Sequence, residues 1–139
     1  MLSAPTVNVI LLVVDEAAYH HSGAQKALEP LLSTVTVHRW SQFTPNPTLT
    51  ELENGVAKYQ ACAPDVVIAI GGGTALDLGK LISFYGKQTI PCRELILSPP
   101  TDTLDPTLLV AIATTSGTGS ETTQFAVIYV DGEKHSVAD

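Results

Sequence analysis

The chain is poor in basic residues, which narrows the partners it can have. Lys and Arg number 7 against 14 Asp and Glu in 139 residues, so the formal net charge is −7. The basic residues are scattered and form no run. Because binding to a phosphate backbone needs clustered Lys and Arg, the sequence argues against a nucleic-acid partner.

Cysteines and long apolar runs are also scarce. Cys62 and Cys92 lack CxxC or metal-site spacing, so we interpret both as ordinary thiols of a reducing cytoplasm. The four histidines show no His-x3-His or similar spacing either. The longest apolar run, residues 9–14, is far too short to span a bilayer, and the first residues lack the basic region of a signal peptide. We therefore expect a cytoplasmic protein without a membrane partner.

What the chain does contain is the composition of one folded domain. Of its residues, 45% are hydrophobic and 15% are charged. Apolar runs predict strands at 7–14, 35–40, 65–70 and 108–113, of which all but the second are expected to be buried. Helical spacing predicts helices over 22–32, with Leu31 on the apolar face, from 48 to Pro64 and over 74–85. Thr48 and Glu51 form a capping-box pattern, and residues 45–47 before them break regular structure. The proline-rich stretch 90–106 is expected to be irregular. Residues 125–137 are typical of a hairpin around Asp131 and Gly132.

This alternation of strands and helices predicts an α/β fold. We expect a Rossmann-like, doubly wound and mostly parallel sheet with right-handed crossovers, followed by a C-terminal β-hairpin. In such sheets ligands bind beyond the carboxyl ends of the strands. Three of those ends carry unusual residues here: Asp15 after the first strand, Gly71–Gly73 after the third, and the Thr/Gly-rich residues 114–121 after the fourth.

The triple glycine is the sharpest of these features. Without Cβ atoms the backbone can adopt positive φ, and a ligand can approach closely. The helix that follows offers unpaired amides and a partial positive charge, which suit a pyrophosphate. The alternative is a tight turn with no ligand. Neither the Walker A pattern nor G-x-G-x-x-G fits, because Leu81 and Leu76 stand at required positions.

The neighbouring polar residues also have structural interpretations. Thr74 and Asp77 form a Thr-x-x-Asp helix cap pattern, and Asp77 and Lys80 have the spacing of an ion pair along a helix. Residues 114–121 suit either a hydroxyl-capped turn or a polar ligand site. Asp15 is able to accept hydrogen bonds from a ribose, although dinucleotide folds usually place that acid after the second strand.

Three segments, taken in order, resemble a known family. Residues 45–48 read PNPT, residues 71–80 read GGGT-x-x-D-x-x-K, and residues 114–121 read TTSGTGSE. They closely resemble the PNPT, GGGS-x-x-D-x-x-K and TTAGTGSE segments of the iron-containing alcohol dehydrogenase family, and the resemblance extends over residues 8–139. It implies the NAD(P)-binding half of a metal-dependent enzyme that transfers hydride between a nicotinamide and a small alcohol or aldehyde.

Carried over position by position, the resemblance also implies a cofactor site. Gly72, Gly73 and Thr74 would contact the pyrophosphate. Asp77 would line the nicotinamide side, and Asp15 would bind the adenosine ribose and favour NAD over NADP. The full implied site consists of Asp15, Gly71, Gly72, Gly73, Thr74, Asp77, Thr114, Thr115, Thr118 and, near the nicotinamide ribose, Lys134.

The resemblance also sets limits. Thr74 replaces a serine, and Ala113 replaces the usual proline. The family's metal ligands, an Asp-x3-His pair and two later histidines, belong to a C-terminal helical domain that we expect to be absent from this chain. We therefore assign no catalytic or metal-binding residue within residues 1–139, and we expect iron and a homodimer only in the intact enzyme. Alone, the chain should bind nucleotide weakly and not oxidise alcohols.

Parts of the sequence also bear on the subgroup and on the alternative functions. Residues 125–136 look similar to those of family members that reduce phosphonoacetaldehyde. Dehydroquinate synthase-like relatives share the architecture, but the TTSGTGSE segment favours the alcohol dehydrogenase branch. The alternative function is a non-catalytic nucleotide- or phosphate-binding module.

Overall fold

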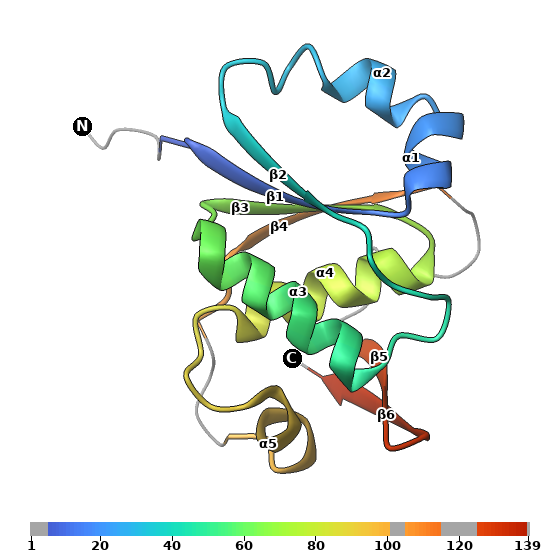
Figure 1. The fold of residues 1–139 in the computed structure, drawn as a ribbon, viewed down its shortest axis with the longest axis vertical. Coiled ribbons are helices and arrows are strands. Elements are labelled where there is room, and N and C mark those ends of the chain that lie inside the picture. The colour runs from blue at the N-terminus through green and yellow to red at the C-terminus, as the bar shows by residue number, and fades with distance from the viewer. Residues whose placement is uncertain (1–5, 101–104, 115–124, 139) are drawn as a thin grey trace.

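The computed structural model describes residues 6–100, 105–114 and 125–138 (Figure 1). Along the chain these residues form β1 (Val9–Val14), α1 (Glu16–His21), α2 (Ala24–Leu28), β2 (Thr36–Trp40), α3 (Leu49–Cys62), β3 (Val66–Gly71), α4 (Gly73–Tyr85), α5 (Cys92–Leu97), β4 (Leu108–Ala113), β5 (Phe125–Val130) and β6 (Glu133–Ala138).

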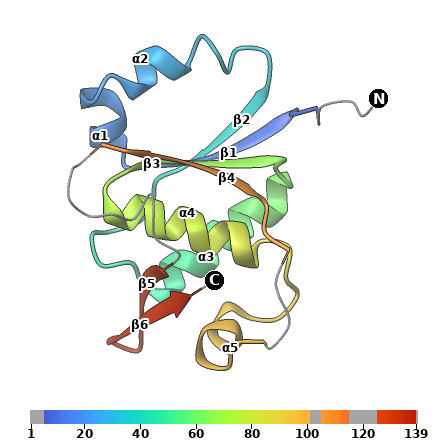
Figure 2. The same cartoon turned by 180° about the vertical axis from the view of Figure 1, so that it is seen from behind.

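Four strands form one parallel sheet in the order β2-β1-β3-β4. Helices α1 and α2 lie on one face, and α3 and α4 lie on the other (Figures 1 and 2). Leu11 and Val13 of β1 therefore point into the core under α3 and α4, whereas Ile10 and Leu12 join the core under α1. Coverage on both faces explains why β1 is apolar at every position. The predicted Rossmann-like, doubly wound sheet is confirmed.

Helix α4 is the central helix of the fold and is buried nearly all round, as the sequence predicted for its apolar positions. Gly79 lets it lie against the sheet, because a Cβ at this position would stand 2.5 Å from the Cβ of Ala69 in β3. The contact fixes α4 directly behind the strand that leads into it. Its N-terminus consequently sits at the carboxyl edge of the sheet.

The C-terminal hairpin is also confirmed, and it forms a separate two-stranded antiparallel sheet. Its two turn residues, Asp131 and Gly132, have φ of 52° and 82°, the positive values that a type I′ turn requires. Ala126, Ile128 and Val130 of β5 are buried in the same core as α3 and α4. The hairpin thus packs on the helical layer rather than extending the main sheet (Figure 2).

The helix predicted over residues 22–32 was wrong in both its start and its length. A separate helix, α1, begins directly after Asp15, and the left-handed Gly23 (φ 85°) separates it from the five-residue α2. Helix α2 ends two residues before Pro30, which lacks the N–H needed to continue a helix. Leu31, expected on the buried face, is consequently 73% exposed.

Two further expectations need correction. The stretch 90–106 contains a helix, α5, which starts after Pro91 and buries Cys92, Leu95 and Ile96. Proline favours helix starts because its φ is already helical and it has no N–H to lose. Strand β4 was expected to be buried, yet it is the edge of the four-stranded sheet, and Leu108 on its outer face is 65% exposed.

One carboxylate joins the amino-terminal ends of the two central strands, β1 and β3, and it leads to a pH prediction. Asp65 accepts hydrogen bonds from the backbone N–H of Asn8 (2.8 Å) and of Val9 (2.9 Å), and these bonds lower its pKa below the usual value. Since the folded-state pKa is the lower one, the stabilisation is complete above the unfolded-state pKa of about 3.9 and is lost as pH falls through the folded-state value.

We expect Asp65→Asn to remove this pH dependence. The urea concentration at the unfolding midpoint should fall more between pH 5 and pH 2 for the wild type than for the variant. Glu133→Gln, on the exposed hairpin, is the control. Parallel losses in wild type and Asp65→Asn would show that the two backbone bonds do not couple proton binding to folding.

Candidate nucleotide-binding site

The candidate site lies where the sheet changes winding direction. The connection after β1 leads outward to β2, and the connection after β3 leads to β4 on the other side, so a crevice opens between β1 and β3. The two strand ends are joined there by the N–H of Asp15, which donates to the carbonyl of Ile70 at 3.1 Å. A cavity of about 150 Å³ lies at this point, lined by Asp15, Phe43, Thr44, Pro45, Gly72, Gly73, Thr74 and Ala75.

Gly71 is required by the fold. Its φ is 151°, in the region that favours glycine, and an added Cβ would stand 2.8 Å from the Cβ of Ala75 and 3.1 Å from that of Asp15. A side chain at this position would strain the backbone and displace the end of β1 and the first turn of α4. This glycine is therefore needed to turn β3 into α4 within a very short distance.

Gly72 and Gly73 leave the start of α4 uncapped. Gly72 occupies the N-cap position with extended backbone (φ −85°) and offers no side chain to the first-turn amides. Helix α4 has 13 residues, so its N-terminal amides carry the partial positive charge of a full-length helix. These residues line the cavity, and an anionic group placed there would meet backbone donors without a side chain in between.

The structure rejects the interpretation of Thr74 and Asp77 as a helix cap. The Thr74 hydroxyl donates to the carbonyl of Pro45 at 2.6 Å, and the Asp77 carboxylate accepts the N–H of Val127 at 3.1 Å. The predicted pair of Asp77 with Lys80 is confirmed, at 4.0 Å between Oδ1 and Nζ in a buried setting. Asp77 thus contacts the hairpin and does not line the cavity.

Asp15 and Thr114 lie at the two neighbouring strand ends. Asp15 caps α1 by accepting the N–H of Ala18 at 3.0 Å, and it is also one of the residues that line the cavity. The N–H of Thr114 donates to the carbonyl of Gly71 at 3.0 Å. The Thr114 hydroxyl is buried and has no hydrogen-bond partner within the described parts of the chain. Thr114 is not in the cavity lining, but a buried hydroxyl without a partner is a group that a bound polar ligand could satisfy.

The implied site includes three more residues. Thr115 and Thr118 are outside the described residues. Lys134 is exposed on β6, opposite Tyr129, and is not part of the cavity lining. The structure therefore brings Asp15, Gly72, Gly73 and Thr74 together around one cavity. Gly71 does not line it and accepts the N–H of Thr114.

The opposite wall of the cavity was missed by the sequence analysis. Phe43, Thr44 and Pro45 come from the connection between β2 and α3, which we had interpreted only as a break in regular structure. The predicted capping box of α3 is confirmed and explains how this wall is held. Glu51 accepts the N–H of Thr48, and its other carboxylate oxygen accepts the N–H of Thr44 at 2.6 Å. The PNPT resemblance was the one signal pointing to this segment.

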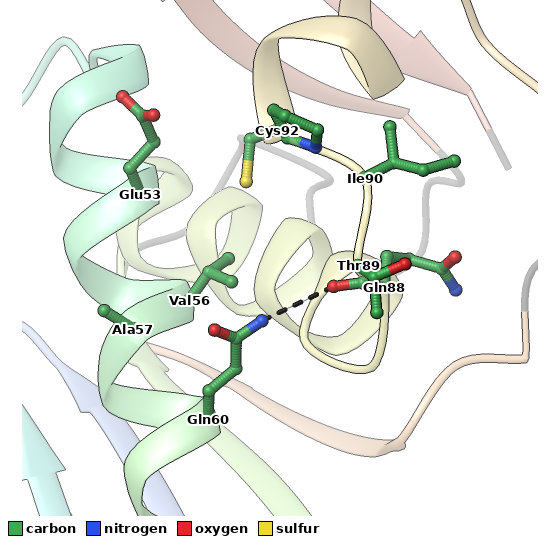
Figure 3. A pocket seen from close by; sticks show the side chains of 9 residues that line it. Glu53, Val56, Ala57, Gln60, Gln88, Thr89, Ile90 and Cys92 are labelled. Carbon is green, nitrogen blue, oxygen red and sulfur yellow. Dashed lines mark hydrogen bonds between the residues drawn. The ribbon is translucent and has the colours of Figure 1, made fainter.

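A second, larger cavity of about 550 Å³ lies between α3 and the start of α5 (Figure 3). Gln60 closes part of it by donating to the carbonyls of Gly86 and Gln88 at 3.4 Å. Burial raises the pKa of Cys92 to about 11, so this thiol stays protonated and unreactive at neutral pH. The larger cavity is not lined by Asp15 or by the first residues of α4, so the smaller cavity is the candidate site.

The described residues include no group of three or more His, Cys, Asp or Glu side chains that could hold a metal ion. Asp131 and His135 have the Asp-x3-His spacing, but they lie on a hairpin rather than on one face of a helix, and Asp131 pairs with Arg93 at 2.5 Å. Within the same ranges, no helix has the length and apolar character needed to cross a membrane.

Fold and site together define a Rossmann-like domain with a glycine-rich nucleotide-type crevice. The iron-containing alcohol dehydrogenase family matches residues 3–139. The chain belongs to this family.

Individual relatives agree with the family match. The chain is 40% identical over 89 residues to 1-propanol dehydrogenase PduQ of Citrobacter freundii, covering 64% of this chain and 20% of that protein. It is 35% identical over 133 residues to the probable alcohol dehydrogenase EutG of Escherichia coli K12, covering 92% of this chain and 33% of the relative.

Solved structures share the fold. Sulfoacetaldehyde reductase of Bifidobacterium kashiwanohense, solved in complex with NAD+, superposes with a TM-score of 0.81 at 23% identity, over 96% of this chain and 36% of the reductase. The chain thus spans a third or less of the length of these two curated relatives and about a third of this solved structure.

The geometry at Gly71 predicts a large loss of stability for Gly71→Ala. Both a positive φ and two close contacts oppose the new methyl group, so we expect a loss of roughly 2–4 kcal/mol in urea denaturation. Gly23→Ala is the matched control, because φ is 85° there and nothing lies within 4 Å of the added Cβ. Its loss should be about 1 kcal/mol, from the backbone alone. Equal losses in the two variants would contradict the role of the Asp15 and Ala75 contacts.

Proposed function

We propose that residues 1–139 form a single dinucleotide-binding domain, the NAD(P)-binding part of a metal-dependent alcohol dehydrogenase or aldehyde reductase. The observation that carries the proposal is the uncapped N-terminus of α4. It faces a cavity at the point where the sheet changes direction. Pyrophosphate oxygens only accept hydrogen bonds, and backbone amides at a helix start only donate them.

The surrounding residues suit the rest of a dinucleotide. The amides of Gly72, Gly73 and Thr74 would hold the pyrophosphate. Asp15 would accept hydrogen bonds from the adenosine ribose, and its negative charge would disfavour the 2′-phosphate of NADP, so the proposal favours NAD. Thr114 has a buried hydroxyl available for a polar group of the ligand.

Thr115 and Thr118 are assigned to the cofactor by the family resemblance alone, as is Lys134. Asp77 remains assigned to the nicotinamide side by resemblance. Its contact with Val127 supports the hairpin at the same time.

In this proposal the chain binds and orients the cofactor. When bound, the nicotinamide supplies or accepts the hydride, and the metal, iron by family resemblance, polarises the substrate oxygen. The metal ligands and most substrate contacts are assigned to the part of the relatives that lies beyond the matched segment. The intact enzyme is proposed to act on a small alcohol or aldehyde in the cytoplasm, as a homodimer.

Calorimetric titration with NAD tests the proposal. The Gly72→Val variant should bind NAD at least about tenfold more weakly than wild type, since its side chain would separate the diphosphate from charge-assisted backbone donors. Ala57→Val on the exposed side of α3 adds a comparable side chain far from the strand ends and should leave the affinity unchanged. NAD binding by Gly72→Val at wild-type affinity would rule out this phosphate site.

The charge of Asp15 predicts the cofactor preference. Asn caps helices as well as Asp does, so Asp15→Asn should keep α1 intact while removing the carboxylate charge. We expect the ratio of NADP to NAD affinity to rise by roughly tenfold, the order of one repulsion between charges near a protein surface. Titrations of both cofactors give the ratio. If it does not change, Asp15 does not sense the 2′ position of the ribose.

A further inference from the structure

The hydroxyl of Thr74 has a single proton, and the structure shows where that proton lies. Thr74 Oγ1 is 2.6 Å from the carbonyl oxygen of Pro45. A carbonyl oxygen only accepts hydrogen bonds, so the hydroxyl must donate to it. What the hydroxyl presents in other directions is a pair of acceptor lone pairs.

This assignment determines what Thr74 can offer to an anion. The diphosphate of a dinucleotide is ionised at neutral pH and likewise only accepts hydrogen bonds. While the bond to Pro45 is in place, the hydroxyl has no proton for a phosphate oxygen. The backbone N–H of Thr74, in the uncapped first turn of α4, is the group able to serve the phosphate.

The hydrogen bond from the Thr74 hydroxyl to Pro45 connects the two walls of the cavity. Pro45 belongs to the segment of residues 43–45 that lines the cavity opposite the start of α4. Other contacts hold the same connection from outside the cavity: Glu51 of α3 accepts from Thr44, and the N–H of Tyr129 donates to the carbonyl of Pro47 at 2.8 Å. Neither of these involves the glycine turn.

We propose that Thr74 is a positioning residue, whose side chain sets the separation of the two walls of the dinucleotide crevice and does not itself bind phosphate. The proposal rests on the function proposed above and deepens it. It divides the site into two parts. Backbone amides at the start of α4 bind the phosphates, and residues 43–45 form the opposite wall, which the Thr74 hydroxyl holds in position. That wall contacts the parts of the dinucleotide beyond the diphosphate.

The first test needs no ligand. Thr74→Val keeps the shape of the side chain and removes the donor, whereas Thr74→Ser keeps the donor. In hydrogen exchange of the ligand-free 139-residue chain, Thr74→Val should raise the exchange rate of the Thr44 amide, which donates to Glu51 within the same segment, by at least about fivefold, the order of one lost hydrogen bond. Thr74→Ser should resemble wild type. Unchanged exchange in Thr74→Val would overturn the proposal.

The second test separates positioning from direct binding. Titrations use NAD and inorganic pyrophosphate as probes. Thr74→Val should bind NAD about fivefold to tenfold more weakly while its affinity for pyrophosphate stays within about twofold of wild type, and Thr74→Ser should restore NAD binding. Equal losses for both probes would make the hydroxyl a phosphate ligand and overturn the proposal. If wild type binds neither probe, the proposed function fails, and the exchange experiment still decides the role of Thr74 in the fold.

Discussion

The close packing of α4 on β3 is the constraint on which the rest of this structure depends. Gly79 brings the helix against Ala69, and Gly71 turns the strand into the helix in a conformation that side chains rarely adopt. Together they hold the N-terminus of α4 at the carboxyl edge of the sheet. A longer or looser turn would move the uncapped amides away from the crevice between β1 and β3, and the site would lose its donors.

Around this point, several residues serve the fold and the proposed site at once. Asp15 caps α1 and borders the cavity, and Asp77 holds β5 while occupying a position that the family motif assigns to the cofactor. The two glycines have different roles. Gly71 adopts the positive φ that the turn needs, whereas Gly72 leaves the first amides of α4 without a side-chain cap. Such dual use explains why conservative variants, rather than truncations to alanine, are needed to separate stability from binding.

The hairpin and the connection from β2 to α3 act as a second layer of support. Tyr129 of β5 bonds to Pro47, and Thr48 forms an isolated bridge with Tyr129, so the hairpin holds the same segment whose near end forms the cavity wall. The hairpin is in turn fastened to α4 by Asp77 and to α5 by Arg93. The shape of the cavity therefore depends on segments that are distant in sequence but are connected through the hairpin to α4.

Local rules were enough for much of this protein. Continuous apolar runs marked the strands, Thr48 and Glu51 marked the start of α3, and Asp131-Gly132 marked the hairpin turn, because each depends on neighbouring residues alone. Tertiary structure decided the partners of polar groups. Thr74 and Asp77 have the spacing of a cap, yet they bond to Pro45 and Val127, which lie 29 and 50 residues away. It also decided that Leu108 is exposed on an edge strand and that residues 43–45 form a wall of the site, since a hydrogen-bond partner or a covering layer from a distant segment leaves no periodic signal in the sequence.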